Sequence, residues 1–167
     1  MLCGFCLPQI NKPMPPIRVK AIVVKGHGVA SGKSHDPRFQ GGTIEMQKPV
    51  FQALGLHLDE YYSGTINLSI APLEYKIKRA KYIFRNVLWS DTAPPEDFSF
   101  FDCRILYGEA QTAADGLIYF PHPETKPQHF QPAGVLEVLT RYIEDLSYGT
   151  ELLIELNDEQ LAISTPP

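Results

Sequence analysis

Small polar side chains alternate with apolar ones in residues 63–70, SGTINLSI. Successive side chains of a strand point to opposite faces, so if the apolar side chains face a core, Thr65, Asn67 and Ser69 face away from it. A hydroxyl and an amide carbonyl are hard oxygen ligands, which suit a Mg²⁺ ion that takes its other ligands from water and substrate phosphates. The alternative interpretation is a half-exposed strand whose polar face is only solvated.

A glycine-rich stretch, GHGVASGKS at 26–34, follows an apolar run and resembles a Walker A phosphate loop at first sight. The spacing excludes that loop, because five residues separate Gly26 from Gly32 where the Walker motif has four. Lys33 also leads into SHDPRFQGG, whose proline and glycines do not start a helix. Two interpretations stay open: a phosphate-binding loop of another kind, and a plain connection between strands.

Composition restricts the class of protein. The chain has 167 residues, 44% of them hydrophobic, and a net charge of −4, which together favour one globular domain. Since no basic block is present, nucleic acid is not an expected partner, and no apolar run is long enough to predict a membrane span. The N-terminus lacks the pattern of a signal peptide, so a cytoplasmic location is expected. The CGFC pair, Cys3 and Cys6, is interpreted as part of a mobile tail.

Hydrophobic periodicity then gives the elements that must position these residues. Strands are predicted at 17–25, 43–47, 63–70, 80–89, 98–107, 116–120 and 150–156, a short helix at 49–56, and either a strand that turns into a helix or a helix throughout at 135–146. No βαβ alternation is present, which argues against a doubly wound nucleotide fold. The sequence therefore predicts a mainly β protein, a compact barrel of six to eight strands with one or two short helices. The barrel is expected over residues 17–158, between tails at 1–16 and 159–167.

A series of motifs in a fixed order resembles the CTP-dependent riboflavin kinases of archaea, and the GTIN match is the sharpest of them. The motifs are G-x-x-S-G at 28–32, Leu-Gly at 54–55, GTINL at 64–68, PHPETK at 121–126, VLEVL at 135–139 and SYGTELLIEL at 147–156. The resemblance covers roughly residues 19–156 and implies a cradle-loop β-barrel. The implied activity is transfer of a phosphoryl group from CTP, with Mg²⁺, to riboflavin, giving FMN.

In the first part of this resemblance, the glycine-rich loop is implied to bind the nucleotide. Gly28, Ser31 and Gly32 would line the phosphates. Lys33 stands in the same loop and is a further candidate for a phosphate contact, although a solvated lysine fits this position as well.

The other matching positions are implied to hold the metal and the flavin. Thr65 and Asn67 would bind Mg²⁺ between nucleotide and acceptor. Thr125 and Glu137 would lie on the flavin side, and Glu137 is the candidate to accept the proton of the terminal ribityl hydroxyl. Phosphoryl transfer depends mostly on positioning and on neutralising the phosphates, so these few groups would suffice.

The chain also departs from the family pattern in its turns. Gly41-Gly42 stands where the family has an acidic residue before its glycine, and Gly149-Thr150 stands where the family has Gly-Asp. Three hypotheses follow: a riboflavin kinase-like enzyme, a non-catalytic barrel that keeps a flavin or nucleotide pocket, and a structural or regulatory barrel related to the swapped-hairpin DNA-binding proteins. The absence of a basic patch counts against the third. In the first two, the expected partner is a small molecule, riboflavin or FMN, and the oligomeric state is not indicated.

Overall fold

A computed structural model describes residues 15–26, 41–126, 128 and 131–167. This part of the chain contains one short helix and nine strands, which confirms the prediction of a mainly β barrel with little helix. The elements are β1 (Ile17–Val24), α1 (Thr43–Ala53), β2 (Ile66–Ser69), β3 (Glu74–Ile77), β4 (Tyr82–Val87), β5 (Glu96–Tyr107), β6 (Thr112–Pro121), β7 (Val135–Thr140), β8 (Glu151–Leu156) and β9 (Leu161–Ser164).

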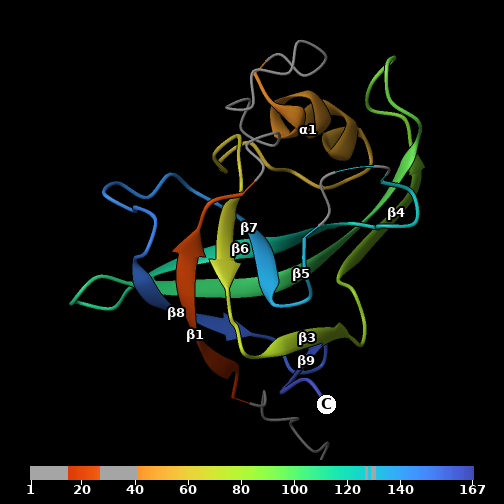
Figure 1. Ribbon diagram of the computed structural model, residues 1–167. Coiled ribbons are helices and arrows are strands. Elements are labelled where there is room, and N and C mark those ends of the chain that lie inside the picture. The colour runs from red at the N-terminus through yellow and green to blue at the C-terminus, as the bar shows by residue number, and fades with distance from the viewer. Residues whose placement is uncertain (1–14, 27–40, 127, 129–130) are drawn as a thin grey trace, which may run out of the picture.

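Six antiparallel strands form a closed barrel in the order β5-β6-β7-β2-β1-β8, and β8 returns to pair with β5 (Figure 1). The closing contacts are set by the registers Ile17↔Leu156 between β1 and β8 and Cys103↔Leu156 between β5 and β8. Because both edges of β8 are paired, the barrel leaves no free edge at this point.

β5 is longer than its neighbours and changes partner along its length. Its first half pairs with β4, with Phe98 opposite Phe84, and its second half pairs with β8 from Cys103 onward. On its other side β5 pairs with β6 over ten consecutive positions, from Phe98↔Pro121 to Tyr107↔Thr112. β4 is therefore an extra strand that extends the sheet beyond the barrel, and the two partner strands diverge near Asp102.

The barrel interior is filled by side chains that alternate along each strand, as the period of two requires. In β2, Leu68 is buried in this core and Ile66 packs against it, and Ile70 follows in the same core after the strand ends. This confirms that Asn67 and Ser69 lie on the outer face. The other fully buried residues of the interior include Phe101, Ile105, Leu136, Val138 and Ile154.

The helix α1 packs on the outside of the barrel, above one end of β5 and β6 (Figure 1). Its buried residues Ile44, Gln47 and Phe51 follow helical spacing, and Phe51 meets Phe98 and Phe100 edge-on, with ring centroids 5.1 Å apart in both pairs. The sequence placed a strand at 43–47 and started the helix at Pro49, and that prediction is wrong. The packing of one apolar face decides the structure here, because it outweighs the local preference of a short segment that contains proline.

Two glycines lead into α1. Gly41 and Gly42 have φ angles of 77° and 94°. Residues that have a Cβ atom rarely adopt these positive φ angles. This turn explains why a glycine pair precedes the helix.

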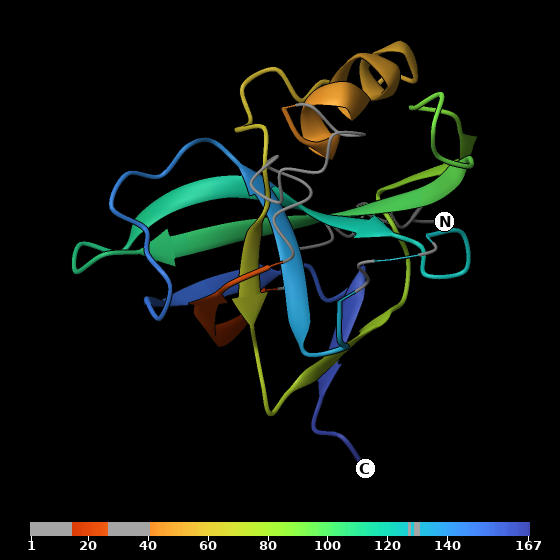
Figure 2. The ribbon, with the colours of Figure 1, turned by 45° about the horizontal axis from the view of Figure 1, so that its top comes forward.

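The chain after Leu156 is ordered, which corrects the expected tail at 159–167. β9 pairs with β3 in a small two-stranded sheet, with Leu161 opposite Ile77, and Leu161 is fully buried in the barrel core. Figure 2 shows this C-terminal strand beside the lower part of the barrel. After β7, residues 141–150 form turns rather than the helix considered for 135–146. The one described helix is too short to cross a membrane.

Candidate functional site

Asn67 and Glu137 lie side by side on the outer face of the barrel. They are directly opposite each other in the antiparallel ladder of β2 and β7. The side chains of such a pair project to the same face, with Cβ atoms about 5 Å apart. Glu137 is 8% exposed, and its neighbours Leu136 and Val138 point into the barrel interior. The fold therefore brings a partly buried amide and a buried carboxylate together from positions far apart in the sequence.

Aromatic side chains continue this row of outward-facing residues beneath α1. Ile118 pairs with Val138, so the next position of the ladder sets Tyr119 beside Glu137. Tyr119 in turn is opposite Phe100, and its hydroxyl donates a hydrogen bond of 3.0 Å to Oε1 of Gln47 on α1. We call Asn67, Glu137, Tyr119 and Phe100 the β2–β5 row; it passes from polar to aromatic across four strands.

Burial and the negative charge of Glu137 raise the pKa values of two tyrosines. Burial raises the pKa of Tyr119 well above its usual range, and the negative charge of Glu137 raises it further. Burial raises the pKa of Tyr75 on β3 to about 12, again with Glu137 as the second cause. Both phenols therefore stay protonated at neutral pH.

Asn67 is held from two directions. Its Oδ1 accepts a hydrogen bond of 2.9 Å from Nε2 of Gln131, just before β7. On another side lies Gly26, where an added Cβ would stand 2.7 Å from Cγ of Asn67. The backbone after β1 thus passes against the amide with no room for a side chain.

The remaining described candidates lie on either side of this row. Thr65 is half-buried and directly precedes β2, one residue before Ile66. Thr125 lies in the turn after β6, where its hydroxyl accepts a 2.8 Å hydrogen bond from the main-chain N–H of Asp97 and donates one of 3.2 Å to the carbonyl of His122. The hydroxyl of Thr125 is therefore engaged with the backbone of its own turn and of β5.

The nucleotide-binding candidates Gly28, Ser31, Gly32 and Lys33 lie outside the described residues. The described chain enters that loop at Gly26, in contact with Asn67.

The donor atoms near Asn67 fit a hard divalent cation. The hydroxyl of Thr65 and the amide oxygen of Asn67 are neutral oxygen ligands, and the carboxylate of Glu137 stands opposite Asn67. Among the described residues, no group of three or more His, Cys, Asp or Glu side chains could hold a metal ion. A site that relies on hydroxyl and amide oxygens needs no such group.

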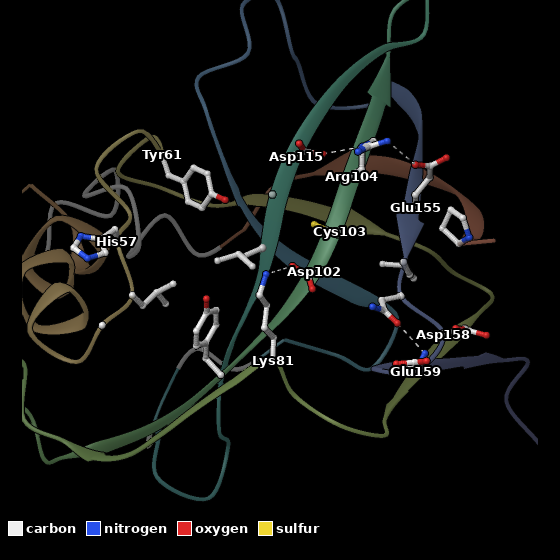
Figure 3. A pocket seen from close by; sticks show the side chains of 18 residues that line it. His57, Tyr61, Lys81, Asp102, Cys103, Arg104, Asp115, Glu155, Asp158 and Glu159 are labelled. Carbon is white, nitrogen blue, oxygen red and sulfur yellow. Dashed lines mark hydrogen bonds and ion pairs between the residues drawn. The ribbon is translucent and has the colours of Figure 1, made fainter. Parts of the chain in front are cut away.

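A hollow lies on the outer face of β5, β6 and β8, apart from the β2–β5 row. This cleft has a volume of about 830 Å³ and is bordered by the loop after α1, the start of β4 and the turn after β8. Figure 3 shows the hydroxyl of Tyr61 pointing into it from one side, with Lys81 and Arg104 among carboxylates on the others. Burial, with the negative charges around it, raises the pKa of Tyr61, against the opposing effect of Lys81.

The two basic side chains labelled in this cleft, Lys81 and Arg104, form ion pairs with carboxylates that also line it. Lys81 lies 2.7 Å from a carboxylate oxygen of Asp102, and Arg104 lies 2.8 Å from Asp115 and 3.9 Å from Glu155. The point where β4 and β8 diverge is closed by the Gln160 side chain, which accepts a 2.7 Å hydrogen bond from the main-chain N–H of Asp102 and donates one of 2.9 Å to its carboxylate.

Sequence reasoning missed three features of these regions. The alternation of GLIYF places Tyr119 opposite in direction to Ile118, so the outward position of this tyrosine was available from the pattern. Gln131 carries no local signal, because its contact with Asn67 depends on how the segment before β7 folds back. The cleft was not predictable either, since it is assembled from several separated segments.

Comparison with known proteins adds no identification. No protein-family model matches the chain, and no curated protein gives a significant match.

Proposed function

We propose that this chain is a riboflavin kinase-like phosphotransferase. It transfers the terminal phosphoryl group of CTP to the terminal ribityl hydroxyl of riboflavin, which gives FMN and CDP and releases the hydroxyl proton. The observation that supports this proposal most strongly is the pairing of Asn67 with Glu137 on neighbouring strands. The two residues belong to separate motifs of the family resemblance, and the activity requires them to meet.

The polar residues of the β2–β5 row have a part in the proposed reaction. Glu137 accepts the proton of the attacking hydroxyl, a step that requires a carboxylate within hydrogen-bond reach of the substrate. Thr65 and Asn67 would hold Mg²⁺, which when bound neutralises phosphate charge. Tyr119 and Phe100, the aromatic side chains beyond Glu137, are buried under α1 and support that end of the row by packing.

The loop that leaves the barrel beside Asn67 is the proposed phosphate-binding element, through Gly28, Ser31, Gly32 and Lys33. CTP is the proposed donor, Mg²⁺ the proposed cofactor and riboflavin the proposed acceptor. Because CTP is a cytoplasmic metabolite, the proposal includes a cytoplasmic location.

Incubation with riboflavin, Mg²⁺ and either CTP or ATP tests the proposal, with FMN separated by chromatography. The expected result is FMN formation with CTP that stops when Mg²⁺ is chelated, and its loss in Asn67→Ala. Ser69→Ala is the matched control, since Ser69 lies on the same face of β2, two residues further along. FMN formed only with ATP would overturn the nucleotide assignment, and riboflavin binding without FMN would leave a non-catalytic flavin-binding barrel.

A further inference from the structure

We infer that Gln131, together with Gly26, fixes the orientation of the Asn67 amide, so that Gln131 is a positioning residue for the cation ligand of the site. This inference rests on the proposed function, because it assumes that the amide oxygen of Asn67 binds the divalent cation.

The hydrogen bond between the two side chains defines which end of the amide is which. Gln131 donates through Nε2 to Oδ1 of Asn67 at 2.9 Å, and the bond joins segments 64 residues apart in sequence. A primary amide offers an acceptor on one side and two donors on the other, and Nε2 of Gln131 faces the acceptor side of Asn67. The contact with Gln131 therefore places the oxygen of Asn67 toward Gln131 and its nitrogen toward β1.

Gly26 restricts the same side chain from the β1 side. A Cβ built at Gly26 would lie 2.7 Å from Cγ and 2.9 Å from Oδ1 of Asn67, which is closer than real Cβ atoms approach other groups. Val24, two residues earlier, is the ladder partner of Asn67, so this approach is set by the register of β1 and β2. Asn67 thus lies between the backbone at Gly26, which its amide contacts closely, and a side chain that donates to its oxygen.

The orientation matters because only one end of the amide can bind a cation. A carbonyl oxygen carries two lone pairs, so it can accept the hydrogen bond of Gln131 with one and still offer the other to Mg²⁺. A flipped amide would present N–H donors to the cation and would repel it. Groups that orient a metal ligand in this way typically change metal affinity or activity by about 10- to 100-fold when they are removed.

The test replaces the donor while keeping the size of the side chain. Gln131→Met removes the N–H but keeps a similar volume, and Gly26→Ala adds the Cβ that would displace Asn67. Gln52→Met on the exposed side of α1 is the matched control. Mn²⁺ serves as the probe: it is titrated into the nitrogen-15-labelled full chain, and paramagnetic broadening of the side-chain amide resonance of Asn67 reports a nearby cation without any turnover.

The expected result is broadening of the Asn67 resonance in the wild type and in Gln52→Met, and a Mn²⁺ affinity about tenfold or more weaker in Gln131→Met and Gly26→Ala. In the FMN assay the same two variants should need more Mg²⁺ for half-maximal rate, while the rate at saturating Mg²⁺ stays close to that of the wild type. Well-dispersed backbone resonances identify the variants that are folded.

The outcomes separate this inference from the proposed function. Wild-type Mn²⁺ affinity in folded Gln131→Met would overturn the positioning role, and so would a wild-type Asn67 resonance that Mn²⁺ leaves unbroadened. If the wild type makes no FMN but shows the expected Mn²⁺ effects, the proposed reaction fails and the positioning of a cation ligand by Gln131 stands.

Discussion

The β2–β5 row and the charged cleft both lie on the outer surface of the barrel, but their polar groups are used differently. In the cleft, Lys81 and Arg104 are both within ion-pair distance of carboxylates. In the row, an amide and a buried carboxylate stand next to phenols that stay protonated. The cleft is a sizeable hollow, whereas the row has the functional groups that phosphoryl transfer needs. The chemistry of the lining, rather than the volume of a hollow, therefore guides the choice of site.

The ion pairs of Lys81 with Asp102 and of Arg104 with Asp115 are largely exposed. The Lys81 and Asp102 side chains are each 41% exposed, and the Asp115 side chain is 78% exposed. Water therefore screens their ion pairs. Glu137 is 8% exposed, and so is Glu155, the one buried carboxylate among the ion pairs described for the cleft. A carboxylate is costly to hold in such a place, and a fold that buries one restricts its geometry, which is the property that a catalytic base requires.

The largest effect is expected from Glu137→Gln, which keeps the shape of the side chain but removes the proton acceptor. FMN formation should fall by about 10²- to 10⁴-fold, the usual contribution of a general base. The rate is measured in single turnover at saturating CTP and riboflavin, and thermal unfolding checks the fold. Glu144→Gln, on an exposed turn, is the control. Full activity in Glu137→Gln would show that Glu137 is not the general base, and the row would then have no catalytic group that distinguishes it from the cleft.

A second effect concerns the helix that covers the aromatic end of the row. Phe51→Ala removes a fully buried ring that packs against Phe98 and Phe100. The free energy of unfolding should therefore fall by about 3–5 kcal/mol, which equilibrium unfolding in urea measures. Leu54→Ala, just after the helix and 49% exposed, should cost far less. A comparable loss in the two variants would mean that α1 is not docked through Phe51.

Alkaline unfolding tests the environment near Glu137. The folded-state pKa of Tyr75 is raised to about 12, above its ordinary value of 10.0. Such a group contributes stability that is fully present below the unfolded-state pKa and is lost as pH rises through the folded-state pKa, so unfolding should become easier between about pH 10 and 12. The loss amounts to about 3 kcal/mol for this group.

The measurement is the free energy of unfolding against pH for the wild type, Tyr75→Phe and the exposed control Tyr148→Phe. Tyr75→Phe should flatten part of the alkaline decline, whereas Tyr148→Phe should follow the wild-type curve. An unchanged decline in Tyr75→Phe would show that this phenol does not sense the buried site.

The smallest effect is expected in the cleft. Arg104→Gln breaks an exposed ion pair with Asp115 and a longer contact with the buried carboxylate of Glu155, which keeps its closer partner Arg18. It should change FMN formation by no more than about twofold, as exposed substitutions usually have small effects. The rate is measured at low and saturating riboflavin. A loss as large as that of Glu137→Gln would reverse the comparison and place the reaction in the cleft.

Local patterning predicted most of the barrel strands but not how they meet. Alternation identified β2 and the outward direction of Asn67, since the period of two is a property of one strand. It failed at 43–47 and at β9, where packing against distant residues decides the structure. The pairing of Asn67 with Glu137 depends on the β2–β7 register, which is fixed by the whole barrel. The family resemblance placed both residues in one site, and the β2–β7 register sets them opposite each other.

The late position of β8 has a consequence for synthesis of the protein. β8 is the strand that joins β1 to β5, and its pairing with β1 links Ile17 to Leu156. While the chain is being made, β1 and the second half of β5 emerge long before the strand that covers them. Their exposed edges can pair with other chains until residues 151–156 arrive. Barrel closure is therefore a late event, and a nascent chain that stalls before β8 is the species most prone to aggregate.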